Sequence, residues 1–275
     1  MLLDKNNYFS LEAQCAYMGF SQFKGFVKEL GGCEAKSMAE LKGEWTDKGK
    51  AVFLVGSYLH AYNEGTLDKF KANNPEIYTS KKMLKADYIK ADKAIEVISK
   101  DTLFMRALSG QKEVIVTAEL FGIPWKIQVD SLFENEKRFT DLKYLRSLDG
   151  KEWNKELHLY EHILRAYGYY LQAAIYSKIL SVSRDLPEGE YFEPLIAAVT
   201  KEDSPDKAII SFVSNQEPLS VFIDNNLFIV GSFIERVKAV KSGQVKPMRC
   251  EKCDYCRSNK KLTGTIHYSH FDNNY

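Results

Sequence analysis

Three short β-type patterns follow one another in the middle of the chain, and they constrain the fold more than any other feature. Residues 112–120 are rich in β-branched side chains, and Phe121-Gly122 then gives the signal of a tight turn. Residues 123–130 alternate apolar and polar side chains, as a half-buried strand should. After a short loop, residues 138–143 read as a third strand. Three strands joined by short turns predict an antiparallel meander.

Helical patterns surround these strands. The expected helices cover residues 21–30, 50–64, 81–98, 156–182 and 225–241. Two further strands are expected over residues 207–214 and 219–224. This order predicts an α/β fold with a central mixed sheet flanked by helices. We expect one structural unit with a helical N-terminal region (1–105), a core (106–245) and a basic, Cys-rich C-terminal tail (246–275).

The composition is that of an ordinary soluble domain. The 275 residues are 45% hydrophobic and 27% charged, and no apolar run approaches the roughly 20 residues of a membrane span. The first residues lack the basic and apolar segments of a secretory signal, so we expect a cytoplasmic protein without a membrane partner. The net charge of +1 argues against broad, non-specific nucleic-acid binding. It still allows a local basic groove beside an acidic metal site.

Two carboxylates and an ammonium group are expected to meet on adjacent strands. Asp130 ends the second strand, and alternation puts Asp141 and Lys143 on one face of the third. Two nearby carboxylates repel each other unless a cation such as Mg²⁺ lies between them, where it can polarise a phosphate oxygen and acidify a bound water. Lys143 would position that water or offset charge on the phosphate. Taken alone, however, an Asp…Asp-x-Lys pattern also fits solvated strand residues.

Further polar residues lie where they could join this group. Gln172 and Tyr176 are one helical turn apart and share a face of the expected long helix. His60 lies on an upstream helix, and Glu119 falls in the first strand, near the carboxylates if the meander closes. Each has an ordinary structural explanation as well, because a lone His or Gln on an apolar helix more often serves packing or a backbone hydrogen bond.

Taken in order, these residues resemble the RecB-like branch of the PD-(D/E)XK nuclease superfamily, and most closely the RecE-like exonucleases of phages and prophages. That branch carries a helix His, an Asp, an Asp/Glu-x-Lys strand and then a Gln-x-x-x-Tyr helix. The resemblance covers about residues 20–260 and is carried by His60, Asp130, Asp141-Leu-Lys143 and Gln172-Ala-Ala-Ile-Tyr176. Val129 stands where many members have Pro, a departure that leaves the metal role of Asp130 intact.

The resemblance also implies roles for these residues. The implied metal-binding groups are His60, Glu119, Asp130, Asp141 and the carbonyl of Leu142. Lys143 is implied as a catalytic residue beside the two carboxylates. Gln172 and Tyr176 would orient the strand that is cut.

The activity implied by the resemblance is that of a DNA exonuclease dependent on Mg²⁺ or Mn²⁺. It would act on linear double-stranded DNA in phage-type recombination, with a RecT-like annealing protein as partner and a homo-oligomer as its assembly. Two alternatives stay open: a structure-specific endonuclease on the same core, and a DNA-binding module without turnover. Closed-circular DNA separates the first alternative from an exonuclease, and added divalent metal separates the second.

Three of the five cysteines cluster as Cys250-x2-Cys253-x2-Cys256, which in a reducing compartment indicates a metal rather than disulfides. Cys33 is the candidate fourth ligand. The arrangement is similar to AddB-type nucleases, in which one Cys before the nuclease motifs and three after them hold a 4Fe–4S cluster, although those proteins space the last two more widely. Zinc suits four thiolates equally, and unligated surface thiols are the alternative. Cys15 is expected to be an ordinary buried thiol.

Overall fold

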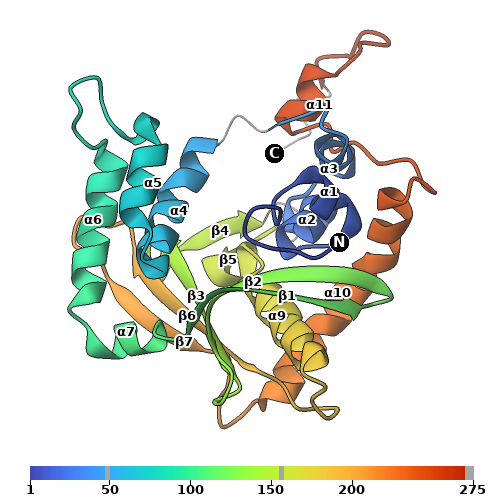
Figure 1. The fold of residues 1–275 in the computed structure, drawn as a ribbon. Helices are drawn as coiled ribbons and strands as arrows, with labels where there is room; N and C mark the ends of the chain where they lie inside the picture. Colours follow the sequence, from blue (N-terminus) through green and yellow to red (C-terminus); the bar gives the residue numbers. More distant parts are fainter. Residues whose placement is uncertain (47–49, 155–157, 270–275) are drawn as a thin grey trace.

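The computed structural model of the protein describes residues 1–46, 50–154 and 158–269. Its centre is a mixed sheet with strand order β1-β2-β3-β6-β7 (Figure 1). The strands of this sheet are β1 (Gln111–Leu120), β2 (Ile123–Phe133), β3 (Arg138–Leu145), β6 (Glu193–Thr200) and β7 (Lys207–Ser211). A separate hairpin is formed by β4 (Lys151–Asn154) and β5 (Leu159–His162). The mixed sheet and its flanking helices confirm the predicted α/β fold.

The first three strands form the antiparallel meander that the sequence predicts. Leu120 pairs with Ile123 across the turn at Phe121 and Gly122. Both turn residues have positive φ, 55° and 70°, as a two-residue hairpin turn of type I′ requires. β3 then pairs in parallel with β6, and β6 pairs antiparallel with β7. The parallel step needs a crossover, which runs through the β4–β5 hairpin, α8 (Ile163–Ala166) and α9 (Tyr169–Ser183).

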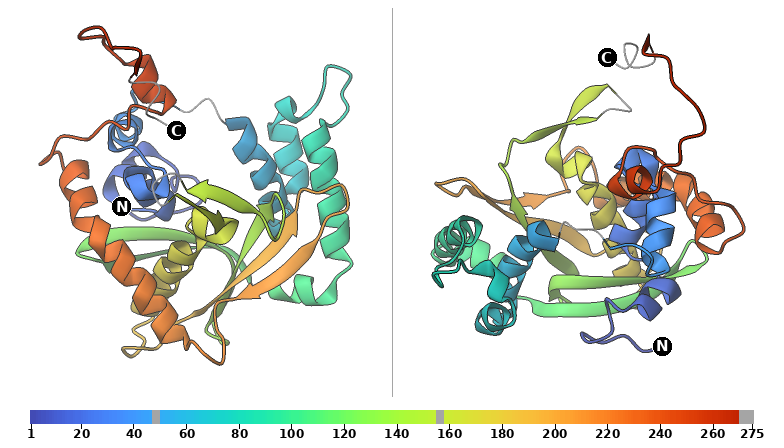
Figure 2. Two further views of the ribbon diagram at one scale, coloured as in Figure 1. Left: turned by 180° about the vertical axis from the view of Figure 1, so that it is seen from behind. Right: turned by 90° about the horizontal axis from the view of Figure 1, so that it is seen from above.

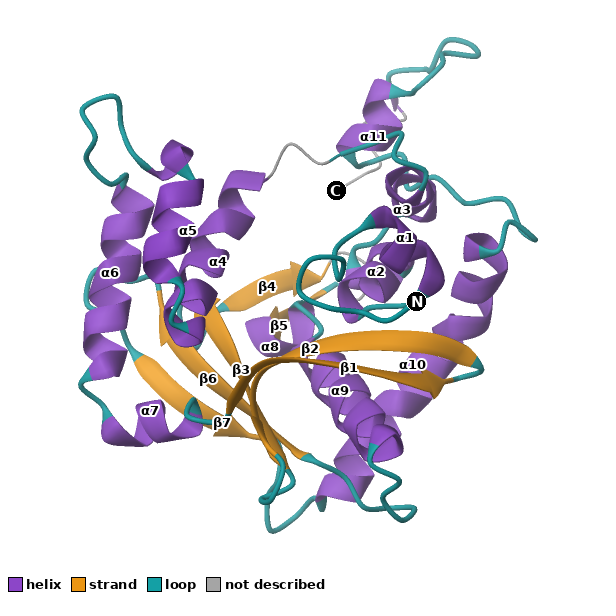
Figure 3. Cartoon of the chain, in the orientation of Figure 1, coloured by secondary structure: helices purple, strands orange, loops and turns teal. Residues whose placement is uncertain are grey.

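Helices cover both faces of the sheet (Figure 3). Alternation in β6 shows the two faces, because Ile196 and Ala198 join a core with α9 and α10, whereas Ala197 and Val199 join a core with α4 and α6. The helices on the α4 side are α4 (Lys50–Glu64), α5 (Leu67–Asn73), the 3₁₀ helix η2 (Pro75–Ile77), α6 (Ala86–Ser99) and α7 (Thr102–Ala107). Those on the α10 side are α8 and α9 together with α1 (Leu11–Ala16), α2 (Phe20–Phe26), the 3₁₀ helix η1 (Lys28–Leu30), α3 (Glu34–Leu41), α10 (Leu219–Lys241) and α11 (Asp254–Ser258).

Three elements differ from the sequence-based expectation. Residues 219–224 were expected to form a strand but begin α10, because a short apolar run fits either structure and here its residues pack with helical spacing against α9. The helix expected from residue 156 begins only at Tyr169, after β5 and α8, and residues 155–157 lie outside the described residues. β6 was not predicted, because it is buried on both faces and shows no polar alternation.

The C-terminal tail returns to the N-terminal helices, as Figure 2 shows for α11 beside α3. The carboxylate of Glu34 accepts hydrogen bonds from the Arg236 guanidinium at 2.9 and 2.8 Å and from the Met248 N–H at 2.7 Å. The Ala35 N–H donates to the Met248 carbonyl at 3.0 Å. These contacts bring the last cysteines beside Cys33. Among the described helices, none combines the length and the apolar composition that a bilayer span requires.

Candidate active site

Asp130 and Asp141 lie where β2 and β3 separate. The last ladder pair between these strands is Ser131 with Thr140, so the two aspartates follow directly on opposite strands. Both carboxylates line the same pocket. Asp130 Oδ2 accepts a hydrogen bond from the Leu142 N–H at 2.7 Å, which fixes one side of the carboxylate. The structure therefore brings the two acids together, while metal ligation by the Leu142 carbonyl stays a prediction.

Lys143 lies beside Asp141 on the same face of β3. Its Nζ is 2.6 Å from Asp141 Oδ2, and the two side chains are only 15% and 14% exposed. The same ammonium lies 4.5 Å from the ring centroid of Tyr169 on α9. Burial opposes the charge of Lys143, but the attraction of Asp141 outweighs it and raises the pKa of Lys143. Burial raises the pKa of Asp141 more than Lys143 lowers it, and Asp130 adds to the rise.

A third acid, Glu113 of β1, joins His60 of α4 at Asp130. Glu113 and Asp130 lie on neighbouring strands between the ladder pairs Lys112–Ser131 and Val114–Val129. Its backbone is left-handed with a φ of 52°, a strained conformation for a residue with a side chain and one that is common at functional sites. Ligand atoms of His60, Glu113 and Asp130 all lie within 4.8 Å of one another. His60 Nδ1 is 3.2 Å from Asp130 Oδ1.

The charges of this cluster suit a bound divalent cation. Among the described residues, the buried atom Glu113 Oε1 has no hydrogen-bond partner, and Asp141 Oδ2 has only its ion pair with Lys143. Burial, and then the charge of Asp130, raise the pKa of Glu113 to about 7. Crowded carboxylates of this kind need protons or a metal. Carboxylate oxygens with one imidazole therefore fit Mg²⁺ or Mn²⁺.

His60 and Asp130 stabilise each other's charge when no metal lies between them. Burial lowers the pKa of His60, but the charge of Asp130 and their hydrogen bond outweigh burial and raise it to about 9. Burial likewise opposes the charge of Asp130, yet His60 and then Lys143 lower its pKa. A metal ion would take over the role that the proton on His60 plays here, since imidazole ligates metal in its neutral form.

Gln172 and Tyr176 lie on the face of α9 that lines the pocket. Gln172 Nε2 donates to Asp141 Oδ1 at 3.3 Å. The Tyr176 ring packs 6.2 Å from the ring of Phe139, and burial raises its pKa well above the ordinary value, so the phenol keeps its proton. The structure thus places a hydrogen-bond donor from each of these side chains at the pocket wall.

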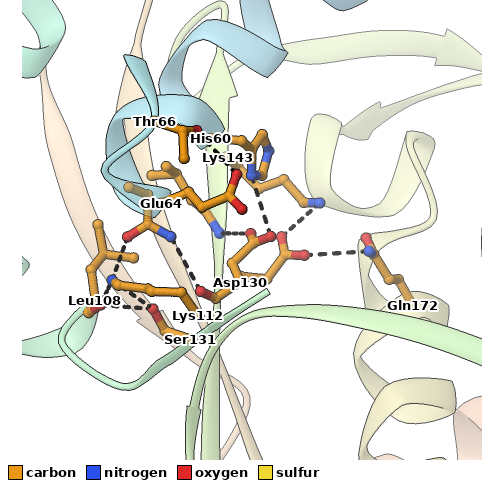
Figure 4. A network of polar contacts seen from close by, with 12 residues as sticks. His60, Glu64, Thr66, Leu108, Lys112, Asp130, Ser131, Lys143 and Gln172 are labelled. Atoms are coloured by element: carbon orange, nitrogen blue, oxygen red, sulfur yellow. Dashed lines mark hydrogen bonds and ion pairs between the residues drawn. The ribbon is translucent and has the colours of Figure 1, made fainter. Parts of the chain in front are cut away.

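A buried polar network holds Asp130 from behind (Figure 4). Asn63 of α4 donates from Nδ2 to the Asp130 carbonyl at 3.2 Å and accepts from Lys112 Nζ at 2.6 Å. Lys112 also donates to the Leu108 carbonyl and to Ser131 Oγ. The network ties α4 to β1 and β2 and so fixes His60 relative to Asp130. Sequence reasoning missed it, because its members come from separate elements with no shared motif.

Glu119 lies away from this site. It is exposed and pairs with Pro124 beside the hairpin turn. It is six positions from Glu113 along β1, a distance of about 20 Å at the rise of a strand. Glu113 is therefore the acid of β1 that reaches Asp130. The sequence-based expectation thus named the correct strand for an acidic ligand, but Glu119 lies at the end of β1 that is far from Asp130.

The site opens into a pocket of about 620 Å³. One wall comes from the N-terminal segment, including Tyr8, Phe9 and Gln14, and the opposite wall comes from α4 and α5, including Lys69 and Phe70. The catalytic candidates line its floor. The two helix groups therefore bound a groove that leads to the carboxylates.

Four cysteines form a second cluster, at the junction of the tail with α3. Cys33 Sγ lies 3.6 Å and Cys250 Sγ lies 3.9 Å from Cys256 Sγ, and one atom of each of the four residues lies within 4.8 Å of the others. The Cys253 N–H points to Cys250 Sγ at 3.3 Å. Burial raises the pKa of the Cys250 thiol, but hydrogen bonds from backbone N–H groups outweigh this effect and lower the pKa to about 6. Cys15 is exposed rather than buried as expected.

Comparison with known proteins agrees with this geometry. Residues 19–259 match the family described as a PDDEXK-like domain of unknown function (DUF3799). The chain belongs to this family. A crystal structure from Eubacterium rectale, described as "Putative exonuclease", is similar to this PDDEXK-like protein with a TM-score of 0.88 and 38% identity over 99% of each chain. A crystal structure of SSO0001 has a TM-score of 0.35 and 14% identity over 93% of this chain and 95% of that one.

Among curated proteins, none matches the sequence. Membership of the PDDEXK-like family confirms the resemblance to the PD-(D/E)XK superfamily that Asp130, Asp141 and Lys143 carry. The narrower resemblances, to RecE-like exonucleases and to the AddB-type cysteine cluster, stay predictions.

Proposed function

We propose that this PDDEXK-like protein is a deoxyribonuclease that depends on a divalent metal. The observation that carries the proposal is the convergence of Asp130, Asp141 and Lys143 with His60 and Glu113 around one pocket. A carboxylate cluster beside a buried ammonium group suits phosphodiester hydrolysis, because it can hold a cation and offset the charge that develops on the phosphate. Family membership and the similarity to the E. rectale protein support the same conclusion.

The residues of the site would have three roles: metal binding, compensation of phosphate charge and orientation of the carboxylates. Glu113, Asp130, Asp141 and His60 would hold Mg²⁺ or Mn²⁺, which when bound supplies a Lewis acid for the phosphate and lowers the pKa of a water. Lys143 offsets negative charge on the phosphate from the side of Asp141. Because Gln172 and the Leu142 N–H each hold one aspartate, the two carboxylates keep their orientation while substrate binds.

We further propose that the substrate is linear double-stranded DNA and that the enzyme removes nucleotides from its ends. The motif resemblance and the similarity to a protein described as "Putative exonuclease" support this part of the proposal. Action in phage-type recombination, a RecT-like annealing partner and a homo-oligomeric assembly stay predictions of the resemblance alone.

A digestion assay on linear and closed-circular duplexes tests the proposal. We expect labelled nucleotides to be released from the linear duplex with Mg²⁺ or Mn²⁺, release to fall to background with EDTA, and the circle to stay intact. Scission of the circle at a comparable rate would identify an endonuclease on the same core. Binding of both DNAs without nucleotide release at any Mg²⁺ or Mn²⁺ concentration would contradict a nuclease altogether.

We also propose that the four clustered cysteines bind zinc or a 4Fe–4S cluster as a structural site. Four thiols at this spacing suit either group, and the site would join the C-terminal tail to α3. We expect the purified protein to contain stoichiometric zinc, or iron and sulfide with a brown colour. Cys256→Ser should lose that metal and melt at a lower temperature, by about 2–4 °C for each kcal/mol of stability lost.

Cys15→Ser provides the matched control, since Cys15 is an exposed thiol outside the cluster. This variant should keep both the metal content and the melting temperature of the wild type. Metal analysis and absorption spectra of protein purified without oxygen make the comparison. A folded wild type that contains neither zinc nor iron would eliminate the site.

A further inference from the structure

The β4–β5 hairpin projects from the body of the protein and presents aromatic rings to solvent. β4 and β5 pair with each other and not with the main sheet. Seen from above, the hairpin leaves the body on the side opposite the N-terminal segment (Figure 2). Trp153 is 46% exposed and Tyr160 is 68% exposed. Two large rings exposed side by side on a projecting element are typical of a binding surface.

The exposed rings share one face of the hairpin with the cationic Lys151 and with His162. Trp153 and Tyr160 are direct cross-strand partners, with ring centroids 5.1 Å apart. Lys151 and His162 form the pair two residues away and therefore project to the same face. None of these four side chains is acidic, so the face suits a ligand that is aromatic and negatively charged.

The carboxylates of the hairpin lie on its other face, where they have partners. Glu152 and Glu161 are cross-strand partners. Glu152 Oε1 accepts from the Tyr167 hydroxyl at 3.1 Å and lies 3.5 Å from the Arg146 guanidinium. Glu161 Oε2 accepts from Asn154 Nδ2 at 2.6 Å. The negative charge is thus turned toward protein groups and away from the aromatic face.

A row of rings and cations connects the hairpin with the catalytic centre. The ammonium of Lys143 lies 4.5 Å from the ring centroid of Tyr169, and the Tyr169 ring lies 5.9 Å from that of Tyr167. Tyr167 in turn bonds to Glu152 of β4, and Lys24 Nζ lies 5.6 Å from the Tyr167 ring centroid. These contacts join the hairpin to the residues beside Lys143 through its Glu152 face, which leaves the opposite face, with Trp153 and Tyr160, open to solvent.

We propose that the aromatic face of the hairpin binds single-stranded DNA by stacking nucleobases on Trp153 and Tyr160. The inference rests on the proposed function in that it takes DNA as the polymer. Unpaired bases expose their faces to aromatic rings, whereas a duplex keeps its bases stacked inside and offers only phosphates. Lys151, on the same face as the two rings, would contact the phosphates beside the stacked bases. The hairpin therefore holds an unpaired strand at the side of the nuclease core.

Binding of a labelled oligothymidylate in EDTA tests the inference without any cleavage. In fluorescence anisotropy, the double variant Trp153→Ala/Tyr160→Ala should bind the single strand at least about 10-fold more weakly, as expected for the loss of stacking on two rings. The single variant Trp153→Phe keeps an aromatic ring at position 153 and should therefore bind the single strand nearly as tightly as the wild type does. Leu159→Ala is the matched control, because Leu159 is an exposed apolar residue of the same hairpin that projects to the other face.

An abasic oligonucleotide of equal length separates base stacking from phosphate binding. The wild type should bind the abasic strand more weakly than oligothymidylate, and the double variant should bind the two alike. The inference would be overturned if the double variant and the wild type bound the single strand with equal affinity. It would also be overturned if the double variant lost as much affinity for blunt duplex as for the single strand. If single-strand binding depends on Trp153 and Tyr160 but the wild type never cuts DNA, the proposed nuclease activity is refuted and the hairpin site is retained. If the wild type cuts DNA but its single-strand binding does not depend on these two rings, only the hairpin site is refuted.

Discussion

Asp141→Ala is expected to lower the rate of DNA hydrolysis by more than about 100-fold, because even residues that only support metal ligands are worth about 10–100-fold. Lys143→Ala is expected to lower the rate by about 10²–10³-fold, the usual effect of removing one group that stabilises developing charge. The two side chains form one largely buried ion pair at 2.6 Å. Single-turnover rates on end-labelled linear duplex at saturating Mg²⁺ measure both effects.

The two variants should differ in their response to metal. Asp141→Ala removes a carboxylate that faces Asp130 across the gap between β2 and β3, so it should need a higher Mg²⁺ concentration for half-maximal rate. Lys143→Ala leaves the carboxylates in place and should keep the wild-type Mg²⁺ dependence with a lower maximum. Circular dichroism and melting curves verify that both variants fold. Wild-type rates in either folded variant would contradict the proposed mechanism.

Local sequence patterns were sufficient for the part of the site that lies within the meander. A period of two puts Asp141 and Lys143 on one face of β3. Asp130 was expected to end the second strand, but β2 continues to Phe133 and pairs with β3 beyond Asp130. Helical spacing likewise puts Gln172 and Tyr176 on one face of α9. These relations are set by backbone geometry over a few residues, and for that reason they could be derived without tertiary structure.

The remaining features depend on tertiary contacts that leave no local pattern. β6 is buried on both faces, so its sequence lacks the alternation that marks a half-buried strand. Residues 219–224 are apolar enough for a strand, and only packing against α9 makes them the first turns of α10. The contact of Asn63 with Lys112 joins a helix to a strand 49 positions away. No spacing rule links two such residues.

Glu113→Gln is expected to weaken binding of Mn²⁺ by about 10–100-fold, whereas Glu119→Gln should leave it unchanged within about 2-fold. Glu113 lies with His60 and Asp130 inside one group of candidate ligand atoms and has a buried carboxylate oxygen without a hydrogen-bond donor. Glu119 is exposed beside the hairpin turn. Both changes replace a carboxyl group of the same strand by an amide, so a general effect of losing a carboxyl group from β1 would appear in both variants. Calorimetric titration with Mn²⁺, without DNA, compares them directly.

The difference between these two acids follows from the register of a single hairpin. With Phe121 and Gly122 as a two-residue turn, Leu120 faces Ile123, and counting back from there sets Glu113 opposite Asp130. The turn signal in the sequence is therefore sufficient to identify Glu113 as the third acid. The alternation of β1 alone is not, because Glu113 and Glu119 lie on the same face of the strand. Equal losses in the two glutamine variants, or a loss only in Glu119→Gln, would show that β1 and β2 pair in another register, and Glu113 would then have no place in the metal site.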